Sequence, residues 1–224
     1  FPVPMVKAPD NIVFFGPPGV GKGVQASGLS ARRGLVHFSM GDALRGEIAE
    51  GTRLGSQIEE ALARGEFASD EAVLAVLEKH LDRHGPVTGL VLDGFPRTLV
   101  QADKLEQLLR QRGGEISRVL LLDADSEVLL ARLTGRLLCV ECTRTFHKVF
   151  RPPERSGVCD ECGGELSRRK DDSEEIQLER LDTYRHLTKP LEGFYRDRGV
   201  LEIIDGSGSI EDVAGLIDRS LGGN

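Results

Sequence analysis

The hydrophobic positions of this chain form short apolar runs separated by longer segments in which apolar residues recur three and four positions apart. The short runs are typical of buried strands and lie at residues 12–15, 35–38, 89–93, 119–122 and 200–204. The spacing of the intervening segments predicts amphipathic helices. Strands that alternate with helices in this way are typical of a parallel sheet covered on its faces by helices. We therefore predict an α/β fold with a five-stranded parallel sheet flanked by helices.

Capping residues and glycines set the expected limits of the helices. A helix over residues 22–33 is closed by Gly34, and Thr98 begins another that ends at Gly113. The remaining helices are expected from Ser39 to Gly51, over 54–64, from Ser69 or Asp70 through Leu81, from Ser126, from Ser173 to a break at Pro190, and over 210–221. Several short helices between the second and third strands predict a subdomain over one side of the sheet.

Two smaller patterns within these helices carry further predictions. Arg132 and Arg136 stand four residues apart after Ser126, so we expect both guanidinium groups on one helix face. The long helix that begins at Ser173 is expected to bury an apolar stripe, formed by Ile176, Leu178, Leu181, Tyr184 and Leu187.

A glycine-rich turn follows the first predicted strand and fits the pattern G-x-x-x-x-G-K from Gly16 to Lys22. Glycines permit positive φ, so successive backbone N–H groups, the helix N-terminus and the Lys22 ammonium can all face phosphate oxygens. Gly23 stands where a serine or threonine usually reaches Mg²⁺, so metal must be held elsewhere, mostly through water. The alternative is a tight strand-to-helix turn with a lysine of no special function.

Asp93 ends the third predicted strand and begins the sequence Asp-Gly-Phe-Pro-Arg, which closes at Arg97. The carboxyl ends of parallel strands are where ligands bind in doubly wound sheets. An aspartate in this position can orient metal-bound water beside the phosphate loop.

The composition narrows the class of protein. The chain has 224 residues and a formal net charge of −7, which argues against a nucleic-acid binder because such proteins usually carry a basic face. No apolar run approaches a membrane span, and no charged and apolar leader opens the sequence. We expect a soluble, cytoplasmic monomer that binds neither nucleic acid nor membrane.

All four cysteines lie in one short region as two C-x-x-C pairs, formed by Cys139, Cys142, Cys159 and Cys162. Without a secretion signal this spacing favours a tetrahedral zinc site over disulfides, although a redox pair or an iron site stays open. Residues 137–167 are poor in large apolar side chains and cannot bury a core of their own. Zinc binding would hold such a segment folded.

Taken together, the motifs resemble the adenylate kinase family over nearly the whole chain. The resemblance rests on Gly-Pro-Pro-Gly-Val-Gly-Lys-Gly, Ser39-Met-Gly-Asp-Ala-Leu-Arg45, Asp93-Gly-Phe-Pro-Arg-Thr-x-x-Gln101, Arg132-Leu-Thr-Gly-Arg136 and Arg169-Lys-Asp-Asp172. The two C-x-x-C pairs are similar to those of the zinc-containing, long-lid subgroup. This resemblance implies reversible Mg²⁺-dependent phosphoryl transfer, ATP + AMP to two ADP. It also implies five segments: core at 1–38, a monophosphate-binding insertion at 39–70, core at 71–136, a zinc lid at 137–168 and core at 169–224.

The resemblance also assigns roles to individual residues. Implied catalytic residues are Lys22, Asp93, Arg97, Arg132, Arg136, Arg169 and Arg180. Implied ATP contacts are Gly19, Val20, Gly21, Lys22, Gly23, Val24, Arg136, Thr145, Phe146 and Gly208. Implied AMP contacts are Ser39, Arg45, Glu66, Phe67, Ala68, Gly94, Arg97, Gln101, Arg169 and Arg180, with Gln101 reading the adenine edge. The lid is expected to close over ATP and exclude water, which would otherwise hydrolyse it.

Three positions on the ATP side depart from the family pattern. Val24 stands where a threonine is usual, Leu137 where a second arginine often lies, and Phe146 where a tyrosine is common. In the loop before Asp70 the usual valine and proline are missing. A kinase for UMP, CMP or GMP, a nucleic-acid-binding zinc ribbon and an inactive interaction module are the competing interpretations.

Overall fold

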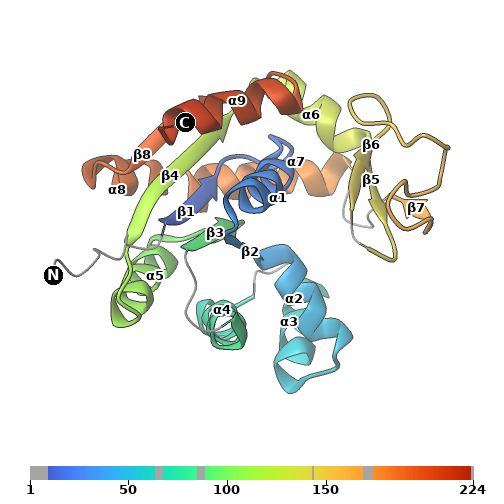
Figure 1. The fold of residues 1–224 in the computed structure, drawn as a ribbon. Helices are drawn as coiled ribbons and strands as arrows, with labels where there is room; N and C mark the ends of the chain where they lie inside the picture. The colour runs from blue at the N-terminus through green and yellow to red at the C-terminus, as the bar shows by residue number, and fades with distance from the viewer. Residues whose placement is uncertain (1–9, 64–67, 85–88, 143, 169–173, 223–224) are drawn as a thin grey trace, which may run out of the picture.

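The structure, a computed structural model, describes residues 10–63, 68–84, 89–142, 144–168 and 174–222. Its centre is a five-stranded sheet with the order β2-β3-β1-β4-β8, in which every neighbouring pair is parallel (Figure 1). The strands are β1 (Asp10–Phe15), β2 (Val36–Ser39), β3 (Gly89–Asp93), β4 (Ile116–Asp123) and β8 (Leu201–Asp205). The predicted fold class is confirmed.

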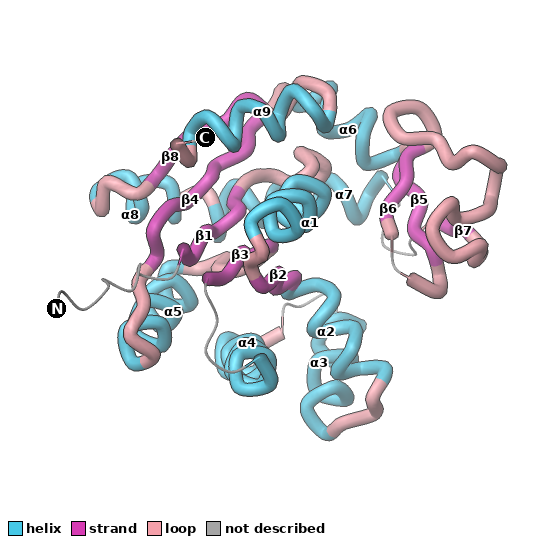
Figure 2. Tube along the Cα trace, in the orientation of Figure 1, coloured by secondary structure: helices cyan, strands magenta, loops and turns pink. Residues whose placement is uncertain are grey.

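Helices cover both faces of this sheet (Figure 2). The helices of the described residues are α1 (Lys22–Arg33), α2 (Met40–Ala49), α3 (Arg53–Ala63), α4 (Asp70–His84), α5 (Leu99–Gln111), α6 (Ser126–Thr134), α7 (Glu174–Thr183), α8 (Leu191–Asp197) and α9 (Ile210–Ser220). A π-helical turn, η1 (Tyr184–Thr188), continues directly from α7.

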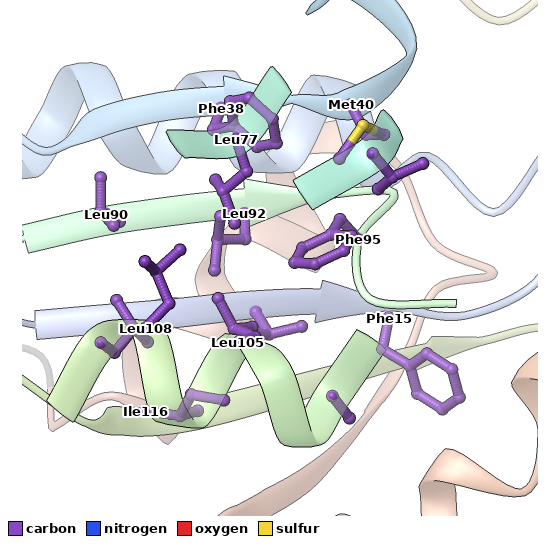
Figure 3. Close-up of a cluster of buried hydrophobic side chains, with 14 of the residues drawn as sticks. Phe15, Phe38, Met40, Leu77, Leu90, Leu92, Phe95, Leu105, Leu108 and Ile116 are labelled. Carbon is purple, nitrogen blue, oxygen red and sulfur yellow. The ribbon is translucent and has the colours of Figure 1, made fainter. Parts of the chain in front are cut away.

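The side chains of β1 show why this strand is apolar from Ile12 to Phe15. Ile12 and Phe14 belong to a buried cluster with α1 and α9, whereas Val13 and Phe15 belong to a second cluster with α4, α5 and α8. Figure 3 shows part of this second cluster, including Phe15, Leu92 and Leu105. A strand buried on both faces is expected to lack a polar side, as this one does.

Two insertions extend from this core. Helices α2 and α3 lie between β2 and β3, and a small antiparallel sheet lies between α6 and α7 (Figure 1). The small sheet has the order β6-β5-β7 and is formed by β5 (Arg136–Cys139), β6 (Thr145–His147) and β7 (Leu166–Ser167). Its one buried cluster among the described residues contains Cys139, Phe146, Cys159 and Leu166.

The expectation that Arg132 and Arg136 share a helix face is wrong. Helix α6 ends at Thr134, and Arg136 is the first residue of β5. Between them the backbone at Gly135 runs against the His147 ring, where an added Cβ would lie 2.3 Å from the ring atoms. The helix therefore stops at a glycine, and the two arginines leave different elements.

The predicted apolar stripe of the long helix is also partly wrong. Leu178 and Leu187 are exposed, at 54% and 46% of their surface, although Leu181 is buried. Leu178 follows Ile176 by two residues, which is about 200° around an α-helix and places it on the opposite face. The π-turn changes the helical phase before Leu187, so that Thr188 is buried instead.

Candidate active site and metal centre

The loop between β1 and α1 has the backbone that a phosphate cradle requires. Gly16, Gly19 and Gly21 all have positive φ, at 137°, 85° and 101°. A Cβ at Gly16 would lie 2.1 Å from the Leu122 carbonyl oxygen, so the loop also passes close to β4. The positive φ values at these glycines fit the backbone of the phosphate loop that the sequence predicts before α1.

Lys22 lies in this loop beside a group of other charged side chains. Its Nζ donates to the carbonyl oxygens of Gly16 and Pro17, both at 2.8 Å. Burial lowers the pKa of Lys22 to about 8, and Asp93 opposes this while Arg97, Arg180 and Arg136 add to it. Four of the predicted catalytic cations therefore lie near one another. A cluster of positive charge of this kind favours the binding of a polyphosphate.

Asp93 is the acidic member of this group. Burial raises the pKa of Asp93, and Lys22, His37 and Arg97 oppose the shift. An added Cβ at Gly23 would lie 3.2 Å from Asp93 Oδ2. A side chain at position 23 would therefore lie in close contact with the Asp93 carboxylate.

Arg132 does not point freely into this group but binds the backbone of two loops. Its Nη1 donates to the carbonyl oxygens of Gly206 at 2.6 Å and Val20 at 3.3 Å. Its Nη2 donates to those of Ser207 at 2.9 Å and Gly208 at 2.8 Å. Arg132 thus links α6 to the phosphate loop and to the turn before α9. Sequence spacing gave no signal for these bonds because the acceptors are backbone atoms 74 to 112 residues away.

Several residues predicted to contact AMP lie at the start of α2 and between β3 and α5. Arg97 Nε donates to the Gly94 carbonyl at 2.9 Å, and its backbone N–H donates to Gln101 Oε1 at 2.8 Å. Arg45 forms an ion pair with Asp42, and the Ser39 hydroxyl accepts from the Asp42 N–H at 3.4 Å as a helix cap.

The remaining predicted contacts on the AMP side divide into two groups. Ala68 is buried at 8% exposure. Glu66, Phe67 and Arg169 lie outside the residues that the structure describes.

In the small sheet the two predicted ATP contacts differ in exposure. Thr145 is half-buried, but the Phe146 side chain is only 2% exposed and packs among the cysteines and Leu166. The Arg151 guanidinium carbon lies 5.2 Å from the centre of the Phe146 ring. The Phe146 ring therefore belongs to the interior of the small sheet and is not exposed to a nucleotide.

The four cysteines converge in the small sheet. Their sulfur atoms all lie within 4.8 Å of one another, with Cys139 Sγ 3.4 Å from Cys162 Sγ and Cys142 Sγ 3.6 Å from Cys159 Sγ. All four are free thiols. A tetrahedral zinc–thiolate site with bonds of about 2.3 Å has sulfurs roughly 3.8 Å apart. The cluster could therefore hold a metal ion of this size, as the spacing of the two pairs predicts.

The polar groups of this cluster also suit a metal-bound thiolate. The backbone N–H of Cys142 donates to Cys139 Sγ at 3.5 Å. This donor is the main reason that the pKa of Cys139 falls to about 7. Backbone N–H donors of this kind are the outer partners that stabilise thiolate ligands.

Comparison with known proteins identifies the family to which the chain belongs. A family profile described as adenylate kinase matches residues 14–200. The chain belongs to the adenylate kinase family. It is similar to the adenylate kinases of Geobacillus sp. (strain WCH70), at 43% identity over 95% of this chain and 99% of the relative, and of Bacillus mycoides (strain KBAB4), at 41% identity with the same coverage. It is 44% identical to that of Trichlorobacter lovleyi over 94% of this chain and 99% of the relative.

Membership in this family also gives the reaction type. The chain is a nucleoside monophosphate kinase, and the reaction is ATP + AMP = 2 ADP. Within the residues that the structure describes, no helix combines the length and apolar character needed to cross a bilayer.

Proposed function

We propose that this reaction takes place at the cation cluster around Lys22, between the phosphate loop and the two insertions. The observation that carries the proposal is the convergence of Lys22, Arg97, Arg136 and Arg180 from four separate parts of the chain. Phosphoryl transfer needs reactants in line and positive charge on the equatorial oxygens, with little covalent help from the protein. Arginines suit this task because each planar guanidinium can meet two phosphate oxygens and stays charged.

On the ATP side, the backbone from Gly19 to Val24 would bind the phosphates, with Arg136, Thr145, Phe146 and Gly208 completing the site. Arg132 contributes by fixing the position of the phosphate loop and of the Gly208 turn. Mg²⁺ that arrives with ATP would neutralise phosphate charge, and Asp93 would orient its bound water. The small sheet would close over ATP as a lid that keeps water out.

On the AMP side, Arg45, Arg97, Arg169 and Arg180 would hold the monophosphate, and Gln101 would face the base. Ser39, Glu66, Phe67, Ala68 and Gly94 would complete this side. The implied segments, with an insertion at 39–70 and a lid at 137–168 in a core of 1–38, 71–136 and 169–224, agree with the places where the two insertions leave the sheet.

The thiolate cluster would hold a structural Zn²⁺ through Cys139, Cys142, Cys159 and Cys162. A structural rather than a catalytic role for this metal is supported by the place of the cluster inside the small sheet, where Cys139 and Cys159 pack with Phe146 and Leu166. The free thiols fit a reducing compartment, and we propose that the protein acts as a cytoplasmic monomer without nucleic-acid or membrane partners.

The decisive experiment measures ADP formation from Mg·ATP with AMP, UMP, CMP and GMP in turn, with zinc analysis of the same preparation. We expect AMP to be converted fastest and about one zinc per chain. Preference for another monophosphate would assign the chain to a different specificity within the same reaction type. No conversion of AMP by zinc-loaded protein would contradict the proposal.

A further inference from the structure

The side-chain amide of Gln101 is held at both ends by groups of fixed hydrogen-bonding character. Gln101 is 5% exposed in the first turn of α5, and its own backbone N–H donates to the Thr98 hydroxyl at 3.1 Å. Its Oε1 accepts from the Arg97 backbone N–H at 2.8 Å, and its Nε2 donates to Asp70 Oδ1 at 2.7 Å. Asp70 is the first residue of α4, which packs beside α5 below the sheet (Figure 1).

These two partners allow one orientation of the amide. A backbone N–H can only donate, and a carboxylate can only accept. If the amide turned by 180°, its NH₂ group would meet the Arg97 N–H, and its oxygen would meet the Asp70 carboxylate. Two favourable contacts would become two repulsive ones, so Asp70 and the Arg97 backbone together prevent the turn.

The amide retains capacity for a ligand in this orientation. A primary amide has two N–H donors and two acceptor lone pairs, and the two observed bonds use one of each. The second lone pair and the second N–H can therefore form a donor–acceptor pair with a planar base, in an order that the protein has already set.

The order of donor and acceptor matters because purine bases differ in the order that they present. Adenine presents an amino donor at its C6 substituent and an acceptor at N1, whereas hypoxanthine and guanine present a carbonyl acceptor and an N1–H donor at the same two places. An amide that cannot turn satisfies one of these edges and leaves the other with two unpaired or opposed groups. A site built to hydrogen-bond one pattern rejects the other strongly.

We propose that Asp70 determines base specificity by holding the Gln101 amide in the orientation that accepts adenine and refuses 6-oxopurines. Asp70 acts through Gln101 and is a positioning residue. This inference rests on the proposed function, in which Gln101 meets the base of the monophosphate.

The test compares AMP with IMP, whose base has the 6-oxo edge but lacks the 2-amino group of guanine and so adds no bulk. Wild-type protein, Asp70→Ala and Asp70→Asn are assayed for kcat/KM with each monophosphate at saturating Mg·ATP. We expect the AMP-to-IMP ratio to fall about tenfold or more in Asp70→Ala, because one bidentate base contact discriminates by roughly 1–3 kcal/mol. Asp70→Asn, whose amide retains an acceptor but can itself turn, is expected to give an intermediate ratio.

Glu71→Ala is the matched control, because it removes the neighbouring acid from the first turn of α4 but leaves Gln101 untouched. Glu71 is 79% exposed, and its carboxylate lies 4.0 Å from Lys104 Nζ. We expect its AMP-to-IMP ratio to match that of the wild type, together with an unchanged KM for ATP in all variants.

The outcomes separate specificity from stability. If Asp70 only stabilised α4, kcat/KM for AMP and IMP would fall in parallel, and the ratio would stay within twofold of the wild type, which would overturn the inference. Wild-type protein that fails to use AMP would instead overturn the proposed function itself. Melting curves of each variant show that the assays are made on folded protein.

Discussion

The helical insertion (residues 39–70) and the small sheet (residues 137–168) are attached to the same core, yet their interiors have little in common. Met40, Ile58 and Ala68 of the helical insertion belong to the large apolar cluster beneath the central sheet. The small sheet has a separate cluster in which two of the four buried residues are cysteines. The first insertion thus shares the core of the protein, whereas the second depends on its own sulfur atoms.

The helical insertion also contains a buried carboxylate, that of Glu47, within this apolar packing. The Glu47 side chain is 6% exposed, and it accepts from Lys79 Nζ of α4 and from the Thr52 hydroxyl at 3.0 Å. A Cβ at Gly55 would lie 2.0 Å from the Glu47 carbonyl oxygen, so α2 and α3 meet backbone to backbone at this point. Glu47 therefore ties α2 to both α3 and α4.

The difference indicates that the two insertions should respond to different chemical conditions. Loss of metal should unfold the small sheet and leave the helical insertion in place, since no sulfur ligand belongs to the latter. Loss of the Glu47 contact should loosen the AMP side and leave the metal in place. The following predictions test this separation from the largest expected effect to the smallest.

The first prediction tests whether Arg136, at the start of the small sheet, takes part in phosphoryl transfer. Arg136→Ala should lower kcat by about 10³-fold with an unchanged fold, by analogy with arginines that neutralise transition-state charge. Arg144→Ala is the control within the same sheet, because Arg144 is exposed and pairs with Glu161 at 3.2 Å. Steady-state kinetics check both variants. A loss below tenfold in Arg136→Ala would show that this arginine is a solvated surface group.

The second prediction concerns the core between the insertions, where the charge of Lys22 should make activity depend on pH above neutrality. Since the pKa of Lys22 is lowered to about 8, its charge is lost as the pH rises through that value. We expect kcat/KM for ATP to fall roughly tenfold for each pH unit above 8. The unfolded chain keeps this proton up to the ordinary pKa of 10.5, so folding stability should rise between about pH 8 and 10.5 rather than fall. A flat activity profile up to pH 9.5 would contradict the role of Lys22.

The third prediction breaks the small sheet alone. Cys139→Ser should remove the metal and lower the melting temperature by about 5–10 °C, with residual activity in the cold. Calorimetry and metal analysis check this, and Glu47→Gln serves as the control with full metal content. An unchanged melt together with complete loss of phosphoryl transfer would identify the metal as catalytic instead.

The fourth prediction breaks the helical insertion alone. Glu47→Gln should destabilise the protein by about 1–2 kcal/mol, because it weakens a buried charge-assisted contact, and should raise KM for AMP several-fold with KM for ATP unchanged. Lys79 lowers the pKa of Glu47, so this contribution is present at neutral pH and is lost as the pH falls below the ordinary value of 4.5.

Glu106→Gln is the matched control for this variant. Glu106 is also nearly buried, at 10% side-chain exposure, and accepts from Arg198 Nε at 2.6 Å, but it joins α5 to the region after α8 in the core. It should lower the melting temperature without changing KM for AMP. Equal changes in KM for both variants would show that Glu47 acts only through overall stability.

The features that sequence predicted well are those encoded by neighbouring residues. The glycine spacing before Lys22 defines the phosphate loop, and the two C-x-x-C pairs define the thiolate cluster. The Thr98 cap is also local, since its hydroxyl binds an N–H three residues away. In each case one short segment contains all the atoms that make the feature.

The features that sequence could not predict are contacts between distant segments. Lys79 lies 32 residues from Glu47, and Asp70 lies 31 residues from Gln101. Spacing along the chain has no information about such pairs, because the packing of α4 on its neighbours decides them. The predicted shared face of Arg132 and Arg136 is wrong for a related reason: α6 ends at Thr134, and Gly135 lies against the ring of His147, which comes from another strand.

The bonds of Arg132 have a consequence for how the protein is made. The carbonyl of Val20 is synthesised long before those of Gly206, Ser207 and Gly208. One guanidinium joins these two parts of the chain. During synthesis, Arg132 can therefore bind both loops only after Gly206, Ser207 and Gly208 have left the ribosome, and the phosphate loop is without this support until then.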